Sequence, residues 1–556
     1  MIDAVVIVVF SAFIMCVGFL FSRTGTNLKS FFAGGEAVPW SIGGLSLFMS
    51  FFSAGTFVVW GSIAYQYGWV AITIQWTMCI GGLITGLYIA PRWKATGNLT
   101  AAEFIKERLG VSVQKSYIYI FMIVSLLIKG SVLYSVSKLV SVSLEFPLIA
   151  CTIVLGIFMI AYTAVGGLWA VMVTDILQFV VLTAAIVIIT PLAFESAGGL
   201  NTFLNRVPDN FYNLVNGPFT WEFIIAFAIY HVFYIGGNWT FVQRFTSVDS
   251  KQSASKVAFL FAALYIVSPV IWMLPPMIYQ TINPNLTGLD TENAYLMVCK
   301  YVLPPGLMGL ILTGMYFSTS ASANTALNVV SAVFTNDIYK SNINKNATDK
   351  QLIRVARLSS WFFGFGMIAI ALIVPHVGGI VEFTLSIGAI TGGPLLAPPI
   401  WALFSKRLTG KATLYITLVS LIINLIFKVL LPSVMGYELG RSGEMLLGVL
   451  LPVTLLTAFE LFQMVRKQTS DEYLQLQDIR KARKEEAVKI NDEDLNASKN
   501  QNAFGLKVIC FSLLFIAALL LILSLFTTKG IGLLRSIAII VAITAYIPWR
   551  SLKKLI

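Results

Sequence analysis

An apolar segment over residues 40–66 is interrupted by the run Ser50-Phe51-Phe52-Ser53-Ala54-Gly55-Thr56. The segment is otherwise long enough to cross a bilayer as a single helix. Two serines, a glycine and a threonine near its middle indicate that the helix opens there. An opened helix exposes carbonyl oxygens and half-helix ends, and these groups can hold a cation or a polar solute at mid-membrane. The run therefore predicts a transporter.

The composition predicts an all-α polytopic membrane protein. The chain has 556 residues, of which 57% are hydrophobic and 12% charged, and its mean hydropathy is +0.82, whereas soluble proteins carry about 25% charged residues. Strict apolar–polar alternation is absent, which argues against a β-barrel.

The net charge of +12 is scattered over short loops, so we expect a lipid bilayer and no nucleic acid as partner. The five cysteines form no CxxC pair, so we read them as core residues rather than as a disulfide or metal set.

Fifteen apolar runs of about 20 residues predict membrane-spanning helices. They cover about residues 2–22, 40–66, 69–91, 114–144, 147–165, 171–194, 221–242, 256–280, 303–336, 354–376, 380–404, 411–432, 443–466, 505–526 and 531–548. The first run is too long for a signal-peptide core and has no cleavage site, so we count it as a retained helix.

Basic residues fix the expected orientation. Loops after even-numbered spans are poor in Lys and Arg, whereas loops after odd-numbered spans carry Arg23, Lys29, Arg92, Lys94, Lys106, Arg108, Arg244, Lys251, Lys256, Lys340, Lys345, Arg354, Arg357, Lys406, Arg407 and Lys411. The positive-inside rule then places the N-terminus outside and the C-terminus in the cytoplasm. We expect a multi-pass protein of the plasma membrane, which in a bacterium is the inner membrane.

A second break is predicted in the seventh span, at Tyr234-Ile235-Gly236-Gly237-Asn238-Trp239. Each glycine costs about 1 kcal/mol in a helix interior, although a glycine pair can also serve close helix packing. Four spans separate the two breaks. That spacing is typical of two inverted five-helix repeats, each opening with a discontinuous helix.

Three motifs resemble the sodium:solute symporter family. Phe31-Phe32-Ala33-Gly34-Gly35 precedes the first broken span, Val165-Gly166-Gly167-Leu168-Trp169-Ala170-Val171 is followed by Thr174-Asp175-Ile176-Leu177-Gln178, and Phe334-Thr335-Asn336-Asp337-Ile338-Tyr339 ends the ninth span. They occur in the family's order over about residues 20–410.

The resemblance implies a LeuT-type fold, with ten core helices in two inverted repeats. The expected organisation is a leading helix over 1–30, a first repeat over 31–194, a second repeat over 195–410, two added helices over 411–466, a charged cytoplasmic loop over 467–504, and C-terminal helices over 505–556. The charge pattern of this loop is typical of a helix that lies in solvent. We read it as a linker, with a regulatory role as the alternative.

The resemblance also implies a Na⁺ site between the first broken helix and the eighth core helix. Its ligands would be the carbonyls of Met49, Phe52 and Ser318 and the side chains at positions 321 and 322. Ser322 offers a hydroxyl, but Ala321 stands where the family usually has Ser. One ligand is therefore missing, or is replaced by Ser320, Ser53 or water.

Asp175 is a carboxylate inside a span, and such a group is functional by default because burying it is costly. Relatives with a second Na⁺ pair this Asp with hydroxyls on the eighth core helix. Those positions are Asn324 and Thr325 here. A second Na⁺ site is left open, beside the alternative that Asp175 lies near the cytoplasmic end and only tunes ion release.

The resemblance places a small polar solute between the two broken helices. The implied contacts are Thr56, Trp60, Gln75, His231, Tyr234, Tyr265 and, more loosely, Ser386. Phe51 and Tyr265 replace polar groups of sugar-carrying relatives. Lys129 lies mid-span, where snorkelling is difficult, so it can face a solute carboxylate or form a structural ion pair.

We therefore predict a Na⁺-coupled symporter, not an enzyme, that takes up a sugar or sugar acid by alternating access. A monocarboxylate, sialic acid or amino acid is the alternative solute. A membrane enzyme would need clustered catalytic groups, but the two His residues lie in separate spans. A channel would need a repeated filter or a charged ring, and a major-facilitator carrier would have twelve spans without paired breaks.

Overall fold

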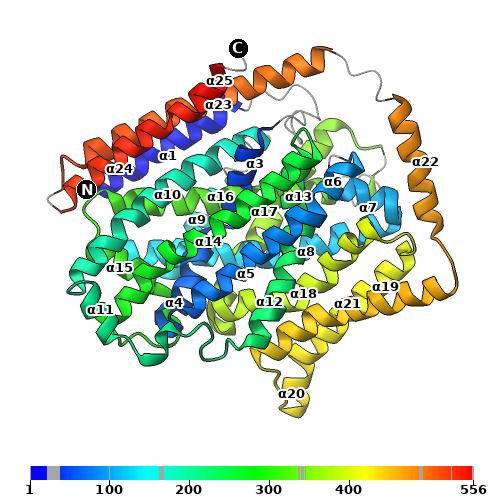
Figure 1. Cartoon of the computed structure of the whole chain (residues 1–556), viewed down its shortest axis with the longest axis horizontal. Coiled ribbons are helices and arrows are strands. Elements are labelled where there is room, and N and C mark those ends of the chain that lie inside the picture. The colour runs from blue at the N-terminus through cyan, green and yellow to red at the C-terminus, as the bar shows by residue number, and fades with distance from the viewer. Residues whose placement is uncertain are drawn as a thin grey trace.

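The computed structural model describes residues 2–21, 38–98, 100–161, 168–335, 339, 343–344, 346–486, 492–527 and 529–553. Within its helices, some side chains lie outside the described set, among them those at 168–170, 321, 322, 324 and 325. The motif over 31–35, residues 165–167 of the second motif, and residues 336–338 of the third also lie outside the described residues. The described part of the chain is helical and contains no β-strand (Figure 1).

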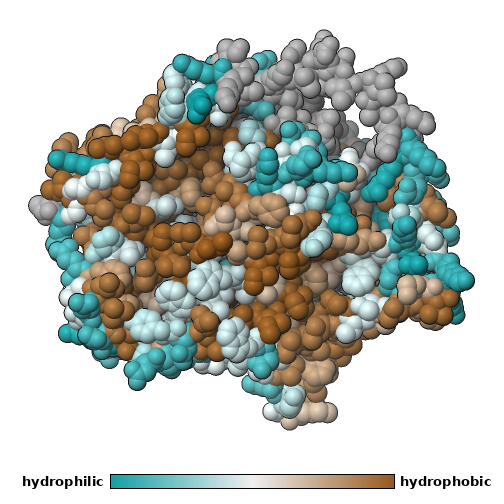
Figure 2. Space-filling view, in the orientation of Figure 1, coloured by the Kyte–Doolittle hydropathy of each residue, from teal (hydrophilic) through white to brown (hydrophobic). Residues whose placement is uncertain are grey.

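The predicted spans are present as helices. Ten described helices are long and apolar enough to cross a membrane, and a bent pair over 221–246 adds an eleventh. Four shorter apolar helices, at 2–17, 40–49, 148–160 and 307–320, fall in the remaining predicted runs. Figure 2 shows hydrophobic residues over most of the visible face, with hydrophilic residues along the right-hand rim and the lower left edge.

The helices up to the second break are α1 (Ile2–Phe21), α3 (Trp40–Met49), η2 (Thr56–Trp60), α4 (Gly61–Tyr67), α5 (Val70–Ile84), η3 (Thr85–Ile89), α6 (Ala90–Thr96), α7 (Ala101–Leu109), α8 (Val111–Leu144), α9 (Leu148–Ala161), α10 (Leu168–Ser196), α11 (Leu200–Arg206), η4 (Asp209–Tyr212) and α12 (Trp221–Gly237).

Those after it are α13 (Trp239–Thr246), α14 (Lys251–Ile282), η5 (Gly288–Asn293), α15 (Ala294–Val302), α16 (Leu307–Val333), α17 (Asp349–Ile373), η7 (Val374–Val377), α18 (Gly379–Phe404), α19 (Gly410–Leu425), η8 (Ile426–Leu430), α20 (Leu431–Met435), α21 (Arg441–Val465), α22 (Asp471–Glu486), α23 (Asp492–Leu523), α24 (Ile531–Thr544) and α25 (Tyr546–Lys553).

The first break confirms the sequence prediction. α3 ends at Met49, residues 50–53 are not helical, and the chain then resumes as the π-helical turn η2 and as α4. The Ser50 hydroxyl donates to the Ser46 carbonyl at 2.7 Å, and the Phe52 amide donates to the Met49 carbonyl at 2.9 Å. Local side-chain bonds of this kind compete with the helical pattern and allow the chain to turn.

The second break is narrower than predicted. Residues 234–237 belong to α12, so the glycine pair is helical, and the interruption falls at Asn238 alone. The two helices meet at a bend of 57°. Asn238 caps α13, because its side chain accepts a hydrogen bond from the Thr240 amide at 3.0 Å. The glycines instead permit close packing, since a Cβ on Gly237 would lie 3.0 Å from the Leu396 carbonyl of α18.

The charged segment after α21 contains the helix α22, which packs against α7. The guanidinium of Arg108, on α7, donates to the carbonyls of Leu408 at 2.9 Å and Ser405 at 2.8 Å, and it lies over the Tyr473 ring of α22. Burial lowers the pKa of Arg108 to about 10, so the group stays charged at neutral pH. Figure 1 shows α22 along the right-hand side, beside α7. The last helix pair begins at Asp492, earlier than the predicted residue 505.

Small residues set the closest helix contacts. A Cβ on Gly448 of α21 would overlap the Ala389 carbonyl of α18, and a Cβ on Gly393 would overlap the Gly448 carbonyl. In a membrane, close backbone approach of this kind replaces the hydrophobic effect as the source of helix association. The α18–α21 contact matters for function because α18 forms one wall of the cavity described below.

We predict that Gly448→Ala lowers the free energy of unfolding by about 1–3 kcal/mol, because an overpacked contact must move apart. Gly366→Ala is the matched control, since Gly366 is also helical but a Cβ added there would have no atom within 4 Å. Thermal unfolding of the purified protein in detergent measures both. Equal melting temperatures for the two variants would contradict this packing account.

Candidate functional site

The two breaks face one cavity of about 370 Å³. Its size lies in the range typical of small-molecule sites, roughly 300–1,000 Å³. Residues 49–53 line it from the first break and residues 238–241 from the second. Faces of η2, α8, α12 and α18 form most of the remaining wall, with one or two residues each from α5, α10 and α16.

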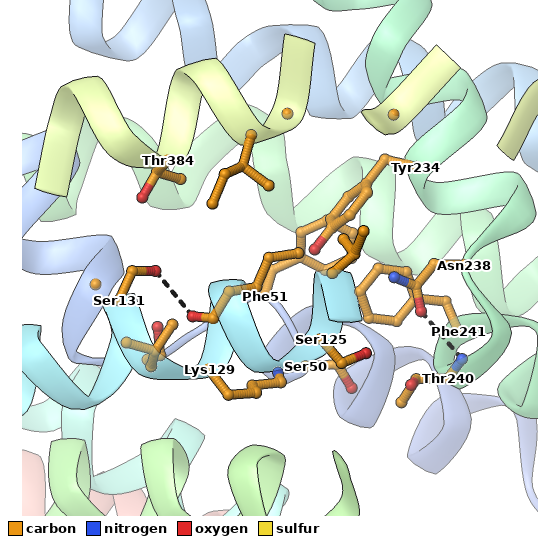
Figure 3. Close-up of a pocket in the computed structure, with 18 of the residues that line it drawn as sticks. Ser50, Phe51, Ser125, Lys129, Ser131, Tyr234, Asn238, Thr240, Phe241 and Thr384 are labelled. Carbon is orange, nitrogen blue, oxygen red and sulfur yellow. Dashed lines mark hydrogen bonds between the residues drawn. The ribbon is translucent and has the colours of Figure 1, made fainter. Parts of the chain in front are cut away.

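Figure 3 shows how the cavity is arranged along its length. Ser131 of α8 and Thr384 of α18 lie toward one end, and Asn238 and Thr240 lie toward the other. Phe51 and Tyr234 lie between these ends. The first break therefore lies near the middle of the cavity, whereas Asn238 of the second break lies toward one end.

Aromatic rings form much of the central wall. Phe51 packs against Tyr234 and Phe241 with ring centroids 5.5 and 4.4 Å apart, and Tyr230 stacks on Tyr234 at 5.4 Å. Trp60, from η2, adds an edge contact with Phe227 at 6.1 Å. Such rings offer a flat apolar surface with polar tips, which suits a ring-shaped solute that carries hydroxyl groups.

The predicted Na⁺ ligands lie where the first break touches α16. The Phe52 carbonyl accepts a hydrogen bond from the Ser318 hydroxyl at 2.7 Å, and the Ala54 amide donates to the Thr319 hydroxyl at 3.1 Å. The Met49 carbonyl lies at the end of α3, one turn before. A carbonyl has two lone pairs, so the bond from Ser318 leaves the Phe52 oxygen able to bind a cation. These neutral oxygens suit a hard monovalent ion.

The other predicted ligands on α16 are only partly described. Ala321, Ser322, Asn324 and Thr325 belong to the helix, one to two turns beyond Ser318, but their side chains lie outside the described residues. Their roles as ligands of the first and second Na⁺ remain predictions. Ser320, named as a substitute ligand, has a buried hydroxyl that finds no hydrogen-bond partner in the described part of the chain.

Asp175 lines the cavity and is bound by two groups. The Ser46 hydroxyl donates to its Oδ2 at 2.7 Å, and the Arg244 guanidinium lies 3.8 Å from the same oxygen. Arg244 also donates to the Thr240 carbonyl at 2.8 Å, so α13 holds it in place. A second Na⁺ at Asp175 would have to share this carboxylate with Arg244 and Ser46.

Arg244 corrects an interpretation of the sequence. We expected it in a cytoplasmic loop, as one of the residues that fix the orientation. It lies inside α13, with 3% of its side chain exposed, and it lines the cavity. The basic loop pattern does not need it, since Lys251 and Lys256 follow within a few residues.

Lys129 lines the cavity from α8. Among the described residues, no carboxylate lies within ion-pair distance of its ammonium group. The other charged side chains on the cavity wall, Asp175 and Arg244, are paired with each other. The described wall therefore carries one positive charge that the protein itself does not balance.

Three further predicted solute contacts lie on the cavity wall. Thr56 begins η2 and donates its hydroxyl to the Phe51 carbonyl at 2.9 Å, and Trp60 ends the same turn. His231 is buried on α12, with its Nδ1 2.6 Å from the Thr77 hydroxyl. One ring nitrogen of His231 is thus hydrogen-bonded to Thr77 of α5.

Three other predicted contacts lie off the wall. Tyr265 packs against Phe48 and Phe261, with ring centroids 4.9 and 4.7 Å away, and Ser386 donates to Glu382 at 3.1 Å. Gln75 is buried on α5, and its Nε2 has no hydrogen-bond partner among the described residues. None of the three lines the cavity as the structure describes it.

Several wall residues were not predicted, notably Ser125, Ser131, Tyr230 and Thr384. On α18 the lining positions Ile380, Thr384, Gly388 and Thr391 recur every three or four residues, which marks one helix face. Ser386 lies about 200° around the helix from Thr384, because successive residues turn by about 100°. If one lining residue of α18 had been known, this spacing of three or four residues would have predicted the others.

Comparison with protein-family models gives a match to the sodium:solute symporter family over residues 31–420. Among curated proteins, a sodium/glucose cotransporter of Vibrio parahaemolyticus is 26% identical over 450 residues, covering 74% of this chain and 81% of that protein. The sodium/sialic acid symporter NanT of Aliivibrio fischeri is 24% identical over 418 residues, covering 72% of this chain and 82% of that protein.

Among solved structures, a substrate-bound, outward-open Na⁺-coupled sialic acid symporter superposes with a TM-score of 0.68 at 20% identity. The match covers 83% of this chain and 98% of that one. At this identity the likeness shows the fold, and it confirms the predicted LeuT-type architecture.

We predict that Asp175→Asn lowers the free energy of unfolding by about 3 kcal/mol, because it leaves the Arg244 guanidinium buried without a counter-charge. Asp175→Asn combined with Arg244→Met should recover most of that loss. Lys300→Gln, which breaks the exposed pair with Glu145, is the control and should cost at most about 1 kcal/mol. A double variant as unstable as Asp175→Asn alone, in denaturant unfolding, would rule out this pairing.

Proposed function

We propose that this chain, which belongs to the sodium:solute symporter family, is a plasma-membrane carrier that couples inward Na⁺ movement to the uptake of a sugar acid. The family membership supports Na⁺ coupling. The observation that carries the choice of solute is the unbalanced positive charge of Lys129 on an otherwise aromatic and hydroxyl-bearing wall. The N-terminus would lie outside and the C-terminus in the cytoplasm, as the loop charges indicate.

The proposed Na⁺ ligands are the carbonyls of Met49, Phe52 and Ser318 and the hydroxyl of Ser322. The contact between Ser318 and Phe52 at 2.7 Å supports this, because it brings the first break and α16 within reach of one ion. When Na⁺ leaves, the Ser318 hydroxyl can satisfy the exposed carbonyl. Ion binding would thus favour one packing of the broken helix against α16, and ion release another.

The driving force available to such a carrier is substantial. One Na⁺ moving inward through 100 mV gains about 2.3 kcal/mol, and a tenfold Na⁺ gradient adds about 1.4 kcal/mol. One ion per cycle could therefore sustain a solute gradient of several hundredfold. We propose one Na⁺ at the first break. A second ion, with Asp175, Asn324 and Thr325 as ligands, would require Arg244 to move aside.

The solute would lie between the two breaks. Its ring would pack against Tyr234 and Trp60, its carboxylate would face Lys129, and its hydroxyl groups would meet Thr56 and the free edge of His231. The unpartnered Nε2 of Gln75 supports a further contact after a small rotation of α5. An amino acid is a poorer candidate, because its ammonium group would need a carboxylate and Asp175 is already paired.

Uptake into proteoliposomes tests the proposal. Radiolabelled neutral sugars, sugar acids including sialic acids, monocarboxylates and amino acids are compared with Na⁺ or choline outside at fixed pH. We expect Na⁺-dependent uptake of a sugar acid. Uptake that is unchanged when choline replaces Na⁺ would overturn the coupling, and Na⁺-dependent uptake of neutral sugars alone would overturn the assignment of solute.

Ser322→Ala should raise the Na⁺ concentration for half-maximal uptake about tenfold, because one neutral ligand is lost. Ala321→Ser, which restores a hydroxyl, should lower it. Ser331→Ala is the control, since Ser331 lies further along α16 and its hydroxyl bonds to Ser360 of α17. If Ser322→Ala and Ser331→Ala have the same Na⁺ dependence, Ser322 is not a ligand.

Lys129→Met should raise the apparent KM for the acidic solute at least about tenfold, because a charge-assisted hydrogen bond is lost. It should leave the uptake of any neutral sugar that the carrier accepts nearly unchanged. Lys300→Met, on the surface, is the control. An equal loss for acidic and neutral solutes would point to a structural role for Lys129.

A further inference from the structure

A second buried charge cluster lies outside the cavity and centres on Glu292. This residue belongs to η5, in the connection between α14 and α15, and is 3% exposed. Its partner Lys138, on α8, is 10% exposed by side chain and lies 2.7 Å from the carboxylate. Lys138 lies on the same helix as Lys129, but it is paired with a carboxylate of the protein itself.

The Glu292 carboxylate joins three separate elements. Its Oε2 accepts hydrogen bonds from the Lys138 ammonium group and, at 3.0 Å, from the Tyr134 hydroxyl, both on α8. Its Oε1 accepts from the Ile380 amide at 2.8 Å, in the first turn of α18. Lys138 also donates to the Leu289 carbonyl at 2.8 Å, which holds η5 against α8.

The start of α18 is shaped to admit this carboxylate. Gly378 and Gly379 have φ of +89° and +81°, in the region that favours glycine. A Cβ on Gly379 would overlap Glu292 Oε1. The N-terminal end of a helix also carries partial positive charge, which stabilises a carboxylate there.

The neighbouring residue ties η5 to the first broken helix. The Thr291 hydroxyl lies 2.7 Å from the Ser62 hydroxyl and accepts a hydrogen bond from the side-chain amide of Gln66 at 2.8 Å. Ser62 and Gln66 both belong to α4. One short turn therefore holds the helix after the first break, the long helix α8, and the start of α18.

The position of α18 determines one wall of the cavity. Ile380 itself lines the cavity, and Thr384, Gly388 and Thr391 follow on the same helix face. The bond between Glu292 and Ile380 is thus one helical turn from the first polar side chain of that wall. A movement of this end of α18 would displace Ile380 and Thr384 and so reshape the cavity on that side.

We propose that Glu292 is a positioning residue of the transport cycle, which holds the first turns of α18 against α8 and α4 and so fixes the position of this wall of the cavity. The proposal deepens the proposed function, since alternating access requires one end of the cavity to open while the other stays shut. Release of the carboxylate from Ile380 would let the start of α18 swing away.

Thiol labelling of the purified full-length protein in detergent tests this without knowledge of the solute or the orientation. The native cysteines are replaced, and a single reporter cysteine is introduced by Leu385→Cys or by Leu395→Cys. Both leucines line the cavity from α18 and are buried, the first near the bond from Ile380 to Glu292 and the second about three turns further along the helix. The test variant is Lys138→Met with Glu292→Met, which removes both charges and leaves neither buried alone. Glu145→Met with Lys300→Met removes an exposed pair in the same way and is the matched control.

We expect the cysteine of Leu385→Cys to be labelled about tenfold faster in the test variant, because the local opening that exposes this buried position becomes more frequent. The labelling rate of Leu395→Cys should change by less than about twofold, and the control should change neither rate. A pair that only stabilised the fold would leave both labelling rates unchanged, since apolar replacement of a buried pair is often neutral for stability.

Gly379→Ala provides a second variant that keeps every charge but displaces the carboxylate. It should also speed the labelling of Leu385→Cys. Failure of either variant to do so in folded, monodisperse protein overturns the proposal, as does equal acceleration at Leu395→Cys. A failure of the transport assignment would instead leave these labelling differences intact while Na⁺-dependent uptake was absent.

Discussion

The structure depends on one constraint: backbone carbonyls freed by an interrupted helix must find partners inside the membrane. At the first break these carbonyls are satisfied by hydroxyl groups rather than by the next helical turn, as the bonds from Thr56 to Phe51 and from Ser318 to Phe52 illustrate. An unsatisfied carbonyl at this depth would cost several kcal/mol. Hydroxyl groups can turn away when an ion arrives, so the same atoms can serve a Na⁺ site.

Charge pairing inside the protein then defines what the cavity can recognise. Asp175 is balanced by Arg244 on one side of the broken helices, and Glu292 is balanced by Lys138 near the start of α18. Of the two carboxylates, Asp175 lies on the cavity wall and would favour a cationic solute if it were unpaired, whereas Glu292 lies outside the cavity. Lys129 is left as the unbalanced charge of the described wall, and this asymmetry favours an anionic group on the solute.

The sequence predicted the spans and both breaks, because each leaves a local signal of small and polar residues within an apolar run. It could not predict which side chains face the cavity. Ser386 lies two residues from Thr384 on α18, and each residue turns the helix by about 100°. Its side chain therefore points to another side of the helix, where it bonds to Glu382. We also predicted from its charge that Arg244 lies in a loop, whereas it belongs to α13. Its partner Asp175 is 69 residues away, so the pairing became visible only in the fold.

Binding of radioactive Na⁺ to the purified protein tests the central claim most directly. We predict saturable binding that unlabelled Na⁺ displaces and choline does not. Binding should disappear when Ser50, Ser53 and Gly55 are replaced together by leucine to restore a continuous helix. Na⁺ binding of unchanged affinity in that variant would contradict the account, since the ion would then not depend on the carbonyls that the interrupted helix exposes.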